Sequence, residues 1–416
     1  MQKIIWNDEK RIELVKSKSQ DQSLNKRDKA YYARILRVLW MKDLSALEWH
    51  PINLIIQKII SSNFFEGFDH IQVPQVVSEW ETFDLFNFPE DHVARRPSDS
   101  YFIQKNETKK ESILLRPHTS VMWYYYLIEW WAKEILEKTW EVKALSWGKV
   151  YRVDELDKTH HECFHQIDGL RITAKDKEII NQDTLKEVLW NTIKALFGQD
   201  AKYRFNVDQF PYTTDSLEVE VWYEWKWLEV TGAWVVHPTV LSKLWLDPEK
   251  YNGWAFGFGI ERLTMAVKHI PDIRIFWSDD SRITNQWWNL NPYKEVSNFP
   301  PVYKDISFLT SKDKFIKDEE KSIKEWWIEL ETRSEADLFE ISGIIRDISG
   351  EAWDLIEEVK LIDIFENDDK FGTDKKSICI RITFRSLERT LTNDEINIVY
   401  LKIREKLQND LNFELR

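Results

Sequence analysis

The sequence predicts an α+β fold with more than one domain, and two observations support this prediction. The chain has 416 residues, which is enough for two or three domains with cores of their own. Residues 50–290 mix helical apolar patterns with β-rich runs, and residues 302–416 alternate strand and helix patterns. No run of about 18 apolar residues occurs, so we expect no membrane span.

The first block, residues 1–49, is highly charged, and we predict a helical extension that packs on the next domain. Its apolar residues recur at helical spacing from Tyr31 to Leu47. Residues 1–10 mix acidic and basic side chains without an apolar block, unlike a secretory signal or an organellar transit peptide. The two cysteines, Cys163 and Cys379, are far apart in sequence and indicate a reducing compartment. We therefore predict a cytoplasmic protein.

The last block, residues 302–416, follows a polar linker at residues 291–301 and has the order βαββαβ of a ferredoxin-like unit. Ser377–Arg385 alternates apolar and polar residues, and Thr392 with Glu395 forms a capping box before a helical stripe. Residues 311–335 look like a charged insertion with no assigned structure. The other predicted elements are a helix at Ala336–Ser349 and strands at Lys304–Leu309, Glu357–Phe365 and Phe413–Leu415.

Two segments of the middle block carry residues suited to chemistry. Residues 254–262 read Trp-Ala-Phe-Gly-Phe-Gly-Ile-Glu-Arg, where glycines permit close approach of a flat ligand and Arg262 can meet a phosphate or an adenine ring. A packed strand would show the same alternation. In the second segment, Arg152 and Asp154 are two residues apart, which predicts one strand face with a phosphate clamp beside an acceptor.

Three histidines, His160, His161 and His165, follow within six residues. They could suggest a metal site, but they lack a cysteine or a spaced carboxylate partner, so phosphate or solvent contacts are the favoured interpretation.

Together these segments resemble motifs 2 and 3 of class II aminoacyl-tRNA synthetases. Several further runs resemble the phenylalanyl-tRNA synthetase family in particular. They are Leu115-Arg116-Pro117-His118-Thr119-Ser120, Thr159-His160, Phe164-His165-Gln166, Phe210-Pro211-Tyr212-Thr213, Trp227-Leu228-Glu229-Val230 and Ile270–Trp277. Residues 381–385 and 388–391 resemble the anticodon-binding domain of the same enzymes. The resemblance covers roughly residues 50–416.

The resemblance implies an organisation and a reaction. Residues 50–290 would be an antiparallel-sheet catalytic domain flanked by helices, and residues 302–416 a ferredoxin-like anticodon-binding domain. Both domains on one chain is the organellar-type arrangement, which implies a monomer. The partners implied are ATP, L-phenylalanine and tRNA-Phe, with Mg²⁺ accompanying ATP, no zinc and no membrane.

The resemblance also implies residue roles. Arg152, Arg262 and His160 would be catalytic. The ATP-binding residues would be Arg152, Asp154, Thr159, His160, Phe164, Glu218 and Arg262. The phenylalanine-binding residues would be His118, Ser120, Gln166, Asp168, Phe210, Tyr212, Glu229, Ala255, Phe256 and Gly257. Asp154, Glu218 and Glu229 are candidates for contact with Mg²⁺ or the nucleotide, or are ordinary strand-face carboxylates.

Basic residues of the last block are candidates for RNA binding, because a sheet face carrying arginine can meet an RNA backbone and unstacked bases. They are Lys376, Arg381, Arg385 and Arg389. A solvated sheet face is the alternative. At the level of the whole chain, the alternatives are a non-catalytic paralogue that binds RNA and a different class II specificity. The net charge of −13 argues against non-specific nucleic-acid binding.

The composition has one abnormal feature: 22 tryptophans and only 11 glycines, although glycine is normally about 7% of residues. By the resemblance, the family has glycine at turns or tight approaches where this chain has Trp49, Trp225, Trp234, Trp245 and Trp353. An aromatic-rich protein is the alternative interpretation. We predict that the source reads the nominal stop codon UGA as glycine and that many tryptophans of this sequence are artefacts of translation.

Overall fold

The structure is a computed structural model that describes residues 3–5, 9–129, 132–208, 213–223, 226–313, 345, 355–410 and 413–416. It consists of an N-terminal unit, Met1–Lys294, and a C-terminal unit, Glu295–Arg416. In the described ranges no helix is both long enough and apolar enough to cross a membrane. The predicted helix at 336–349, apart from the helical Ile345, lies outside the described residues, as does most of the stretch 311–335.

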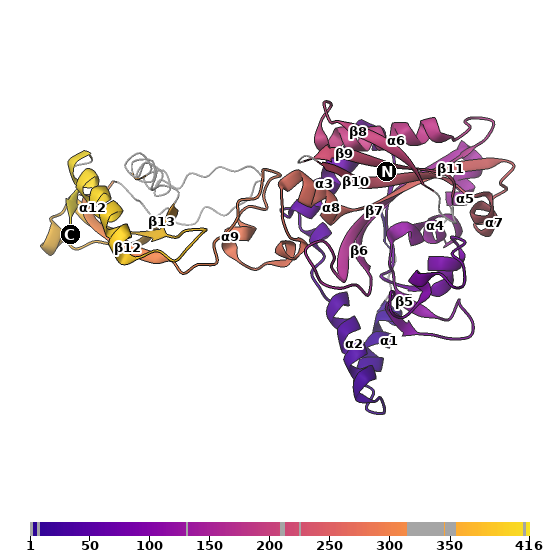
Figure 1. The fold of residues 1–416 in the computed structure, drawn as a ribbon, viewed down its shortest axis with the longest axis horizontal. Coiled ribbons are helices and arrows are strands. Elements are labelled where there is room, and N and C mark those ends of the chain that lie inside the picture. Colours follow the sequence, from indigo (N-terminus) through magenta and orange to yellow (C-terminus); the bar gives the residue numbers. More distant parts are fainter. Residues whose placement is uncertain are drawn as a thin grey trace. The chain divides into compact units, whose positions relative to one another are not determined.

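The N-terminal unit is built on an eight-stranded sheet with the order β1-β2-β6-β7-β11-β10-β9-β8 (Figure 1). Pairs β1–β2 and β2–β6 are parallel, and all other neighbours are antiparallel. The strands are β1 (Lys3–Ile5), β2 (Asp69–Gln72), β6 (Glu141–Tyr151), β7 (Cys163–Ala174), β8 (Tyr203–Asp208), β9 (Thr213–Tyr223), β10 (Lys226–Val236) and β11 (Tyr251–Gly259).

One face of this sheet is covered by three helices, α3 (Pro51–Ile60), α6 (Gln182–Phe197) and α8 (Ile260–Lys268). Because strand side chains alternate between faces, Ile167 of β7 and Phe256 of β11 point into this layer. The helices begin at defined caps: the Asn181 side chain accepts from the backbone N–H of Asp183 and Thr184 at the start of α6. This layer is the larger core of the unit.

The opposite face is only partly covered, by α4 (Met122–Tyr124), α5 (Ala132–Thr139) and α7 (Pro238–Lys243) with the turns between them. Leu170, Trp234 and Ala255 point into this second core. A three-stranded sheet, in the order β3-β5-β4, lies beside it. Its strands are β3 (Val76–Ser78), β4 (Phe102–Gln104) and β5 (Ile113–Leu115). Short helical turns connect these parts: η1 (Leu44–Ala46), η2 (Asn63–Phe65), η3 (Trp80–Asp84), η4 (Val93–Arg95), η5 (Thr119–Val121), η6 (Tyr125–Glu129), η7 (Ile273–Trp277) and α9 (Ser281–Thr284).

The N-terminal extension forms a helical hairpin of α1 (Glu9–Gln20) and α2 (Lys26–Leu39), which extends away from the sheet (Figure 1). The predicted helix from Tyr31 to Leu47 therefore starts earlier and ends at Leu39. Ile35, Val38 and Leu39 pack against the three-stranded sheet, as the apolar spacing predicts. Arg34 Nε donates to Glu162 Oε2 over 2.8 Å, which ties the hairpin to the segment before β7.

The C-terminal unit contains a four-stranded sheet in the order β13-β14-β12-β15, the order of a ferredoxin-like unit. Its core is formed by one face of β12 and β14 together with α12. The predicted capping box is confirmed: Glu395 N–H donates to Thr392 Oγ1, and Thr392 N–H donates to Glu395 Oε2. The elements are β12 (Val302–Ser311), β13 (Ile356–Phe365), α11 (Asp368–Phe371), β14 (Lys375–Phe384), α12 (Asn393–Asp410) and β15 (Glu414–Leu415).

Candidate functional site

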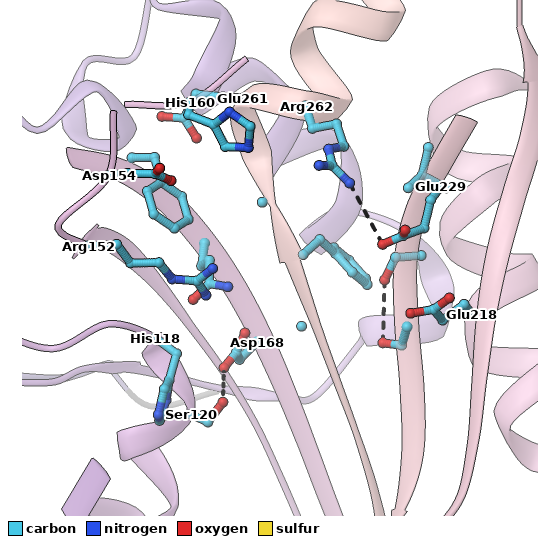
Figure 2. Close-up of a pocket in the computed structure, with 18 of the residues that line it drawn as sticks. His118, Ser120, Arg152, Asp154, His160, Asp168, Glu218, Glu229, Glu261 and Arg262 are labelled. Carbon is cyan, nitrogen blue, oxygen red and sulfur yellow. Dashed lines mark hydrogen bonds and ion pairs between the residues drawn. The ribbon is translucent and has the colours of Figure 1, made fainter. Parts of the chain in front are cut away.

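A pocket of about 420 Å³ opens on the less covered face of the eight-stranded sheet, where β7, β11, β10 and β9 lie side by side. Figure 2 shows Arg152 and Arg262 entering it from different sides, with His118, Ser120 and Asp168 together at one end. The residues that line the pocket are Phe86, Phe88, His118, Ser120, Arg152, Asp154, Thr159, His160, His161, Phe164, Gln166, Asp168, Glu218, Glu229, Val230, Thr231, Gly232, Trp234, Gly257, Phe258, Gly259, Glu261, Arg262 and Ile273.

The period of two along the strands decides which predicted residues reach this pocket. On β7, Phe164, Gln166 and Asp168 alternate with core residues and share the pocket face. Gly257 pairs with Asp168 across the strands, and a Cβ built on Gly257 would lie 2.6 Å from Asp168 Oδ1. Only glycine therefore leaves room for this carboxyl group.

Two residues predicted to surround the phenylalanine ring do not line the pocket. Phe256 points to the opposite face and stacks on Phe258, with 4.6 Å between ring centroids. Ala255 is on the pocket face, but it is fully buried in the second core with Trp234, its register partner on β10. Phe210 and Tyr212, the other two predicted ring contacts, lie outside the described residues.

The buried end of the pocket holds a carboxyl group whose pKa is raised. Burial raises the pKa of Asp168 to about 7, against the opposing effect of its hydrogen bond with Ser120. Ser120 Oγ donates to Asp168 Oδ2 over 2.5 Å. Within the described part of the chain, Asp168 Oδ1 and Gln166 Oε1 are buried and accept no hydrogen bond. Two buried acceptors without donors are suited to a ligand that brings N–H groups.

His118 adds a third acceptor at this end. Burial, and then the nearby Arg152 charge, lower the pKa of His118 to about 4, so the ring is neutral at neutral pH. Its Nε2 lies 3.1 Å from the carbonyl oxygen of Thr82, which requires the proton on Nε2. Nδ1 is then an acceptor, and it is buried with no hydrogen-bond partner among the described residues. His118, Gln166 and Asp168 together form an acceptor-rich end suited to an ammonium group.

The two arginines approach the other part of the pocket. The Arg152 guanidinium lies 5.2 Å from the centroid of the Phe164 ring, a cation–π contact that orients it. Arg262, in the first turn of α8, lies 3.7 Å from Glu229. The prediction that Arg152 and Asp154 share a strand face was wrong, because β6 ends at Tyr151 and both residues belong to the following loop. Both still line the pocket.

Asp157 organises that loop, and sequence reasoning missed it. Its Oδ1 accepts from the backbone N–H groups of Thr159 and His160 at 2.6 and 2.7 Å, and from Thr159 Oγ1 at 3.0 Å. Hydrogen bonds with His160 and Thr159 lower the pKa of Asp157. An Asp that accepts from backbone N–H groups two and three residues ahead is typical of a tight turn. This turn places Thr159 and His160 at the pocket.

The three clustered histidines have three different environments. His160 Nδ1 lies 3.0 Å from Asp157 Oδ2. His161 stacks on Trp277, with ring centroids 4.2 Å apart and an angle of 9° between the planes. His165 is fully buried. Among the residues that the structure describes, no group of three or more His, Cys, Asp or Glu side chains could hold a metal ion.

His165 is the buried centre of a network that sequence reasoning also missed. Its Nδ1 lies 2.6 Å from Glu261 Oε1, and its Nε2 lies 3.3 Å from Asp43 Oδ1. Burial lowers the pKa of His165, but the two carboxylates outweigh burial and raise it to about 9. Glu261 also accepts from the His165 backbone N–H. The network fixes the start of α8 against β7, and so fixes the backbone that carries Arg262.

In the C-terminal unit, the predicted RNA-binding residues are held by partners of their own. Arg381 donates to both carboxylate oxygens of Asp305, at 2.7 and 2.8 Å, and Arg389 makes a two-point contact with Glu395. Arg385 bonds Glu357 and has a side chain only 14% exposed. Lys376 lies on the core face of β14 with a side chain 3% exposed, which removes it from the surface that RNA can reach.

Both units match known families. Residues 38–287 match the tRNA synthetases class II core domain (F), and residues 334–416 match the ferredoxin-fold anticodon binding domain. The N-terminal unit therefore has the core of a class II aminoacyl-tRNA synthetase.

Relatives with assigned functions resolve the class further. The chain is 35% identical to the chloroplastic/mitochondrial phenylalanine–tRNA ligase of Arabidopsis thaliana, over 88% of this chain and 78% of that protein. It is 32% identical to the mitochondrial phenylalanine–tRNA ligase of Dictyostelium discoideum, over 90% and 87% of the two chains. The mitochondrial phenylalanine–tRNA ligase of Mus musculus is 30% identical, over 88% and 81%. The chain belongs to the phenylalanine–tRNA ligase family, in its single-chain organellar type.

The same comparisons correct the predicted location. Five relatives that match over 88–90% of the chain are named mitochondrial or chloroplastic, so the prediction of a cytoplasmic protein was wrong. That prediction used two separated cysteines and the charges of residues 1–10. Unpaired cysteines indicate a reducing compartment but do not distinguish one such compartment from another.

Proposed function

We propose that this chain activates L-phenylalanine with ATP to phenylalanyl-adenylate and then transfers the phenylalanyl group to tRNA-Phe. The observation that carries the proposal is one pocket with two chemically distinct ends. One end offers the buried acceptors of Asp168, Gln166 and His118, and the other offers Arg152 and Arg262. An amino acid that presents its ammonium group to the first end directs its carboxylate toward the arginines and a nucleotide phosphate.

In the first step, a carboxylate oxygen of phenylalanine attacks the α-phosphorus of ATP, and the bond to the pyrophosphate oxygen breaks. The nucleophile is already ionised at neutral pH, so the pocket needs no general base for this step. Arg152 and Arg262 would hold the phosphate oxygens from two sides as negative charge redistributes in the in-line displacement. Phe164 would stack on the adenine, with His160 and Thr159 near the triphosphate.

Mg²⁺ would accompany the nucleotide, because Mg²⁺ in such sites is bound through one or two carboxylates together with substrate phosphates. Glu218 and Glu229 both line the pocket and fit that donor set, with Asp154 as a further candidate. When bound, the metal would neutralise phosphate charge. The carboxylates of this chain would hold the ion beside the triphosphate.

We further assign residues 1–49 to a helical extension, 50–290 to the catalytic domain, 291–301 to a linker and 302–416 to the anticodon-binding domain. A chain that carries both domains is expected to act as a monomer, which light scattering in solution tests.

The test of the proposed function is phenylalanine-dependent exchange of pyrophosphate into ATP, followed by charging of tRNA-Phe. We expect faster exchange with phenylalanine than with leucine, because edge-to-face ring contacts favour an aromatic side chain. Exchange that is stimulated equally by several amino acids would contradict the proposed specificity. A folded chain that binds tRNA without any exchange would indicate a non-catalytic relative.

A further inference from the structure

Two tryptophans of the N-terminal unit adopt a backbone conformation that bulky residues rarely enter. Trp140 has φ +67° and Trp245 has φ +60°. The other non-glycine residues with positive φ in the described ranges are Asn87 and His269. Left-handed backbone brings Cβ close to the following carbonyl oxygen, so this region favours glycine, and a bulky side chain there is an outlier.

Trp245 occupies the position after a helix where glycine is most often found. At the end of α7, the Trp245 N–H donates to Ser242 O and the Leu246 N–H donates to Leu241 O. Both hydrogen bonds have a donor–acceptor distance of 3.0 Å. This pair of bonds is the Schellman motif, with Trp245 at the left-handed C′ position. Leu241 and Leu246 are both buried, which completes the motif. Trp245 is 67% exposed, so packing does not explain an indole there.

Trp140 occupies the corresponding left-handed position at the end of α5. Its N–H donates to Leu136 O over 2.8 Å, the single bond that defines the simpler left-handed cap. Trp140 is 48% exposed. Two independent helices of one unit thus end in the glycine conformation with an exposed indole at the glycine position.

Trp234 lies in a different setting, inside the pocket. On the pocket face its cross-strand partner on β11 is Ala255, and the indole Cη2 lies 3.5 Å from the point where a Cβ on Gly257 would be. Gly257 pairs in turn with Asp168 and with Gly232. The small residues at 232, 255 and 257 leave a hollow beside the acceptor-rich end, and the Trp234 indole occupies it.

We propose that the natural protein carries glycine at positions 140, 234 and 245, and that position 234 determines which amino-acid side chains the pocket admits. Glycine at 234 would uncover Ala255 and open the hollow beside Asp168 to an aromatic ring. The whole chain has 22 tryptophans and only 11 glycines. This excess follows if one type of codon, translated as tryptophan in this sequence, is read as glycine in the source. The part concerning position 234 rests on the proposed function, whereas the two helix ends do not.

The structure also separates these positions from tryptophans that belong to the fold. Trp254 is 1% exposed, and it packs beside Phe68 and Phe256 with ring centroids 6.0 and 5.9 Å apart. Trp123 and Trp287 are fully buried. A glycine in place of any of these would leave a large cavity in the core. Trp254 is therefore a matched control for the recoded positions.

The direct test is peptide mass spectrometry of the protein isolated from its natural source. Glycine at 140, 234 and 245 together with tryptophan at 254 is the expected result. Tryptophan at 140 and 245 would overturn the inference, and tryptophan at 234 alone would overturn its specificity part.

A second test uses the printed sequence made in a host that decodes every tryptophan as written. Trp140→Gly and Trp245→Gly should each raise the melting temperature by about 2–4 °C, since relief of a strained site is expected to shift a domain of this size by that amount. Trp254→Gly should lower the melting temperature. Trp234→Gly should raise kcat/KM for phenylalanine about tenfold or more, through KM for phenylalanine and not KM for ATP.

The outcomes distinguish the inference from the proposed function. If the printed chain exchanges pyrophosphate well and Trp234→Gly does not improve it, position 234 does not limit the pocket and the specificity part fails. If the natural protein has glycine at all three positions and shows no phenylalanine-dependent exchange, the inference about the helix ends stands and the proposed function fails. Lower melting temperatures for Trp140→Gly and Trp245→Gly would contradict the argument from backbone conformation.

Discussion

The pocket of the N-terminal unit and the basic strand face of the C-terminal unit differ in whether their polar groups are paired with other side chains. In the pocket, Asp168 and Gln166 have buried oxygens that accept no hydrogen bond from the part of the chain that the structure describes. On β14 and after it, Arg381 and Arg389 already have carboxylate partners. A buried unsatisfied polar group costs about 1–3 kcal/mol, whereas an exposed ion pair contributes little. Buried oxygens without donors that also line a pocket therefore indicate a ligand site more directly than a count of charges does.

Arg152→Ala should produce the largest effect, because this arginine would act mainly on the charge that develops in the transition state. We expect phenylalanine-dependent pyrophosphate exchange to fall by about 10²-fold or more with the fold intact. Circular dichroism and melting temperature establish the fold, and steady-state exchange kinetics establish the loss.

The matched control is Arg282→Ala in the same unit. Arg282 makes an ion pair with Asp280 over 2.6 Å and does not line the pocket. Removal of this positive charge should leave exchange close to the parent value. If both variants lost activity equally, the effect of Arg152→Ala would reflect a general loss of positive charge. Arg152 would then have no special role in the pocket.

Asp168→Asn should produce the next largest effect. The substitution keeps the shape of the side chain but removes the charge that would hold the ammonium group, so KM for phenylalanine should rise about 10- to 100-fold. Because the pKa of Asp168 is about 7, the parent should bind phenylalanine progressively more weakly as the pH falls below 7. The variant should lose this pH dependence, and a parent with flat affinity between pH 6 and 8 would contradict the assignment.

Asp168→Asn should have the opposite effect on stability: it should weaken phenylalanine binding but stabilise the unliganded protein. A carboxyl group whose pKa is raised on folding stabilises the folded state fully below its ordinary pKa, and that contribution is lost as the pH rises through about 7. Unliganded Asp168→Asn should therefore be more stable than the parent at pH 8, and the difference should shrink toward pH 5. Thermal unfolding at several pH values measures this difference. A variant that is less stable at pH 8 would indicate a structural role for the charge.

Local patterns predicted much of the fold and part of the site. The alternation in β14 and the capping box of α12 depend on neighbours in sequence, and both are as expected. The same period of two places Phe256 and Gly257 on opposite faces. Which face carries the pocket, however, is decided by where α3, α6 and α8 pack, and short-range patterns do not contain that information.

Contacts between distant segments account for what sequence reasoning missed. The network centred on His165 joins Asp43, His165 and Glu261 from three separate elements, and no spacing rule brings them together. The prediction for Lys376 failed for a different reason. Lys376 lies an even number of residues from Ile378 and Ile380 along the strand, so it shares their core face. Counting the basic residues along the strand ignored which face of the sheet each one occupies.

The smallest predicted effect tests whether the basic strand face binds RNA at all. Arg381 on β14 lies opposite Asp305 on β12, so two substitutions on the same pair make opposite predictions. If Arg381 meets an RNA phosphate, Arg381→Ala should weaken tRNA charging about three- to tenfold and lower the slope of affinity against salt by roughly one. Asp305→Asn removes a competing carboxylate, so it should strengthen tRNA binding. Amino-acid activation should be unchanged in both variants, because that reaction uses the other unit. If both variants instead weakened charging equally and lowered the melting temperature, the pair would serve the fold, and the RNA surface would lie elsewhere on the chain.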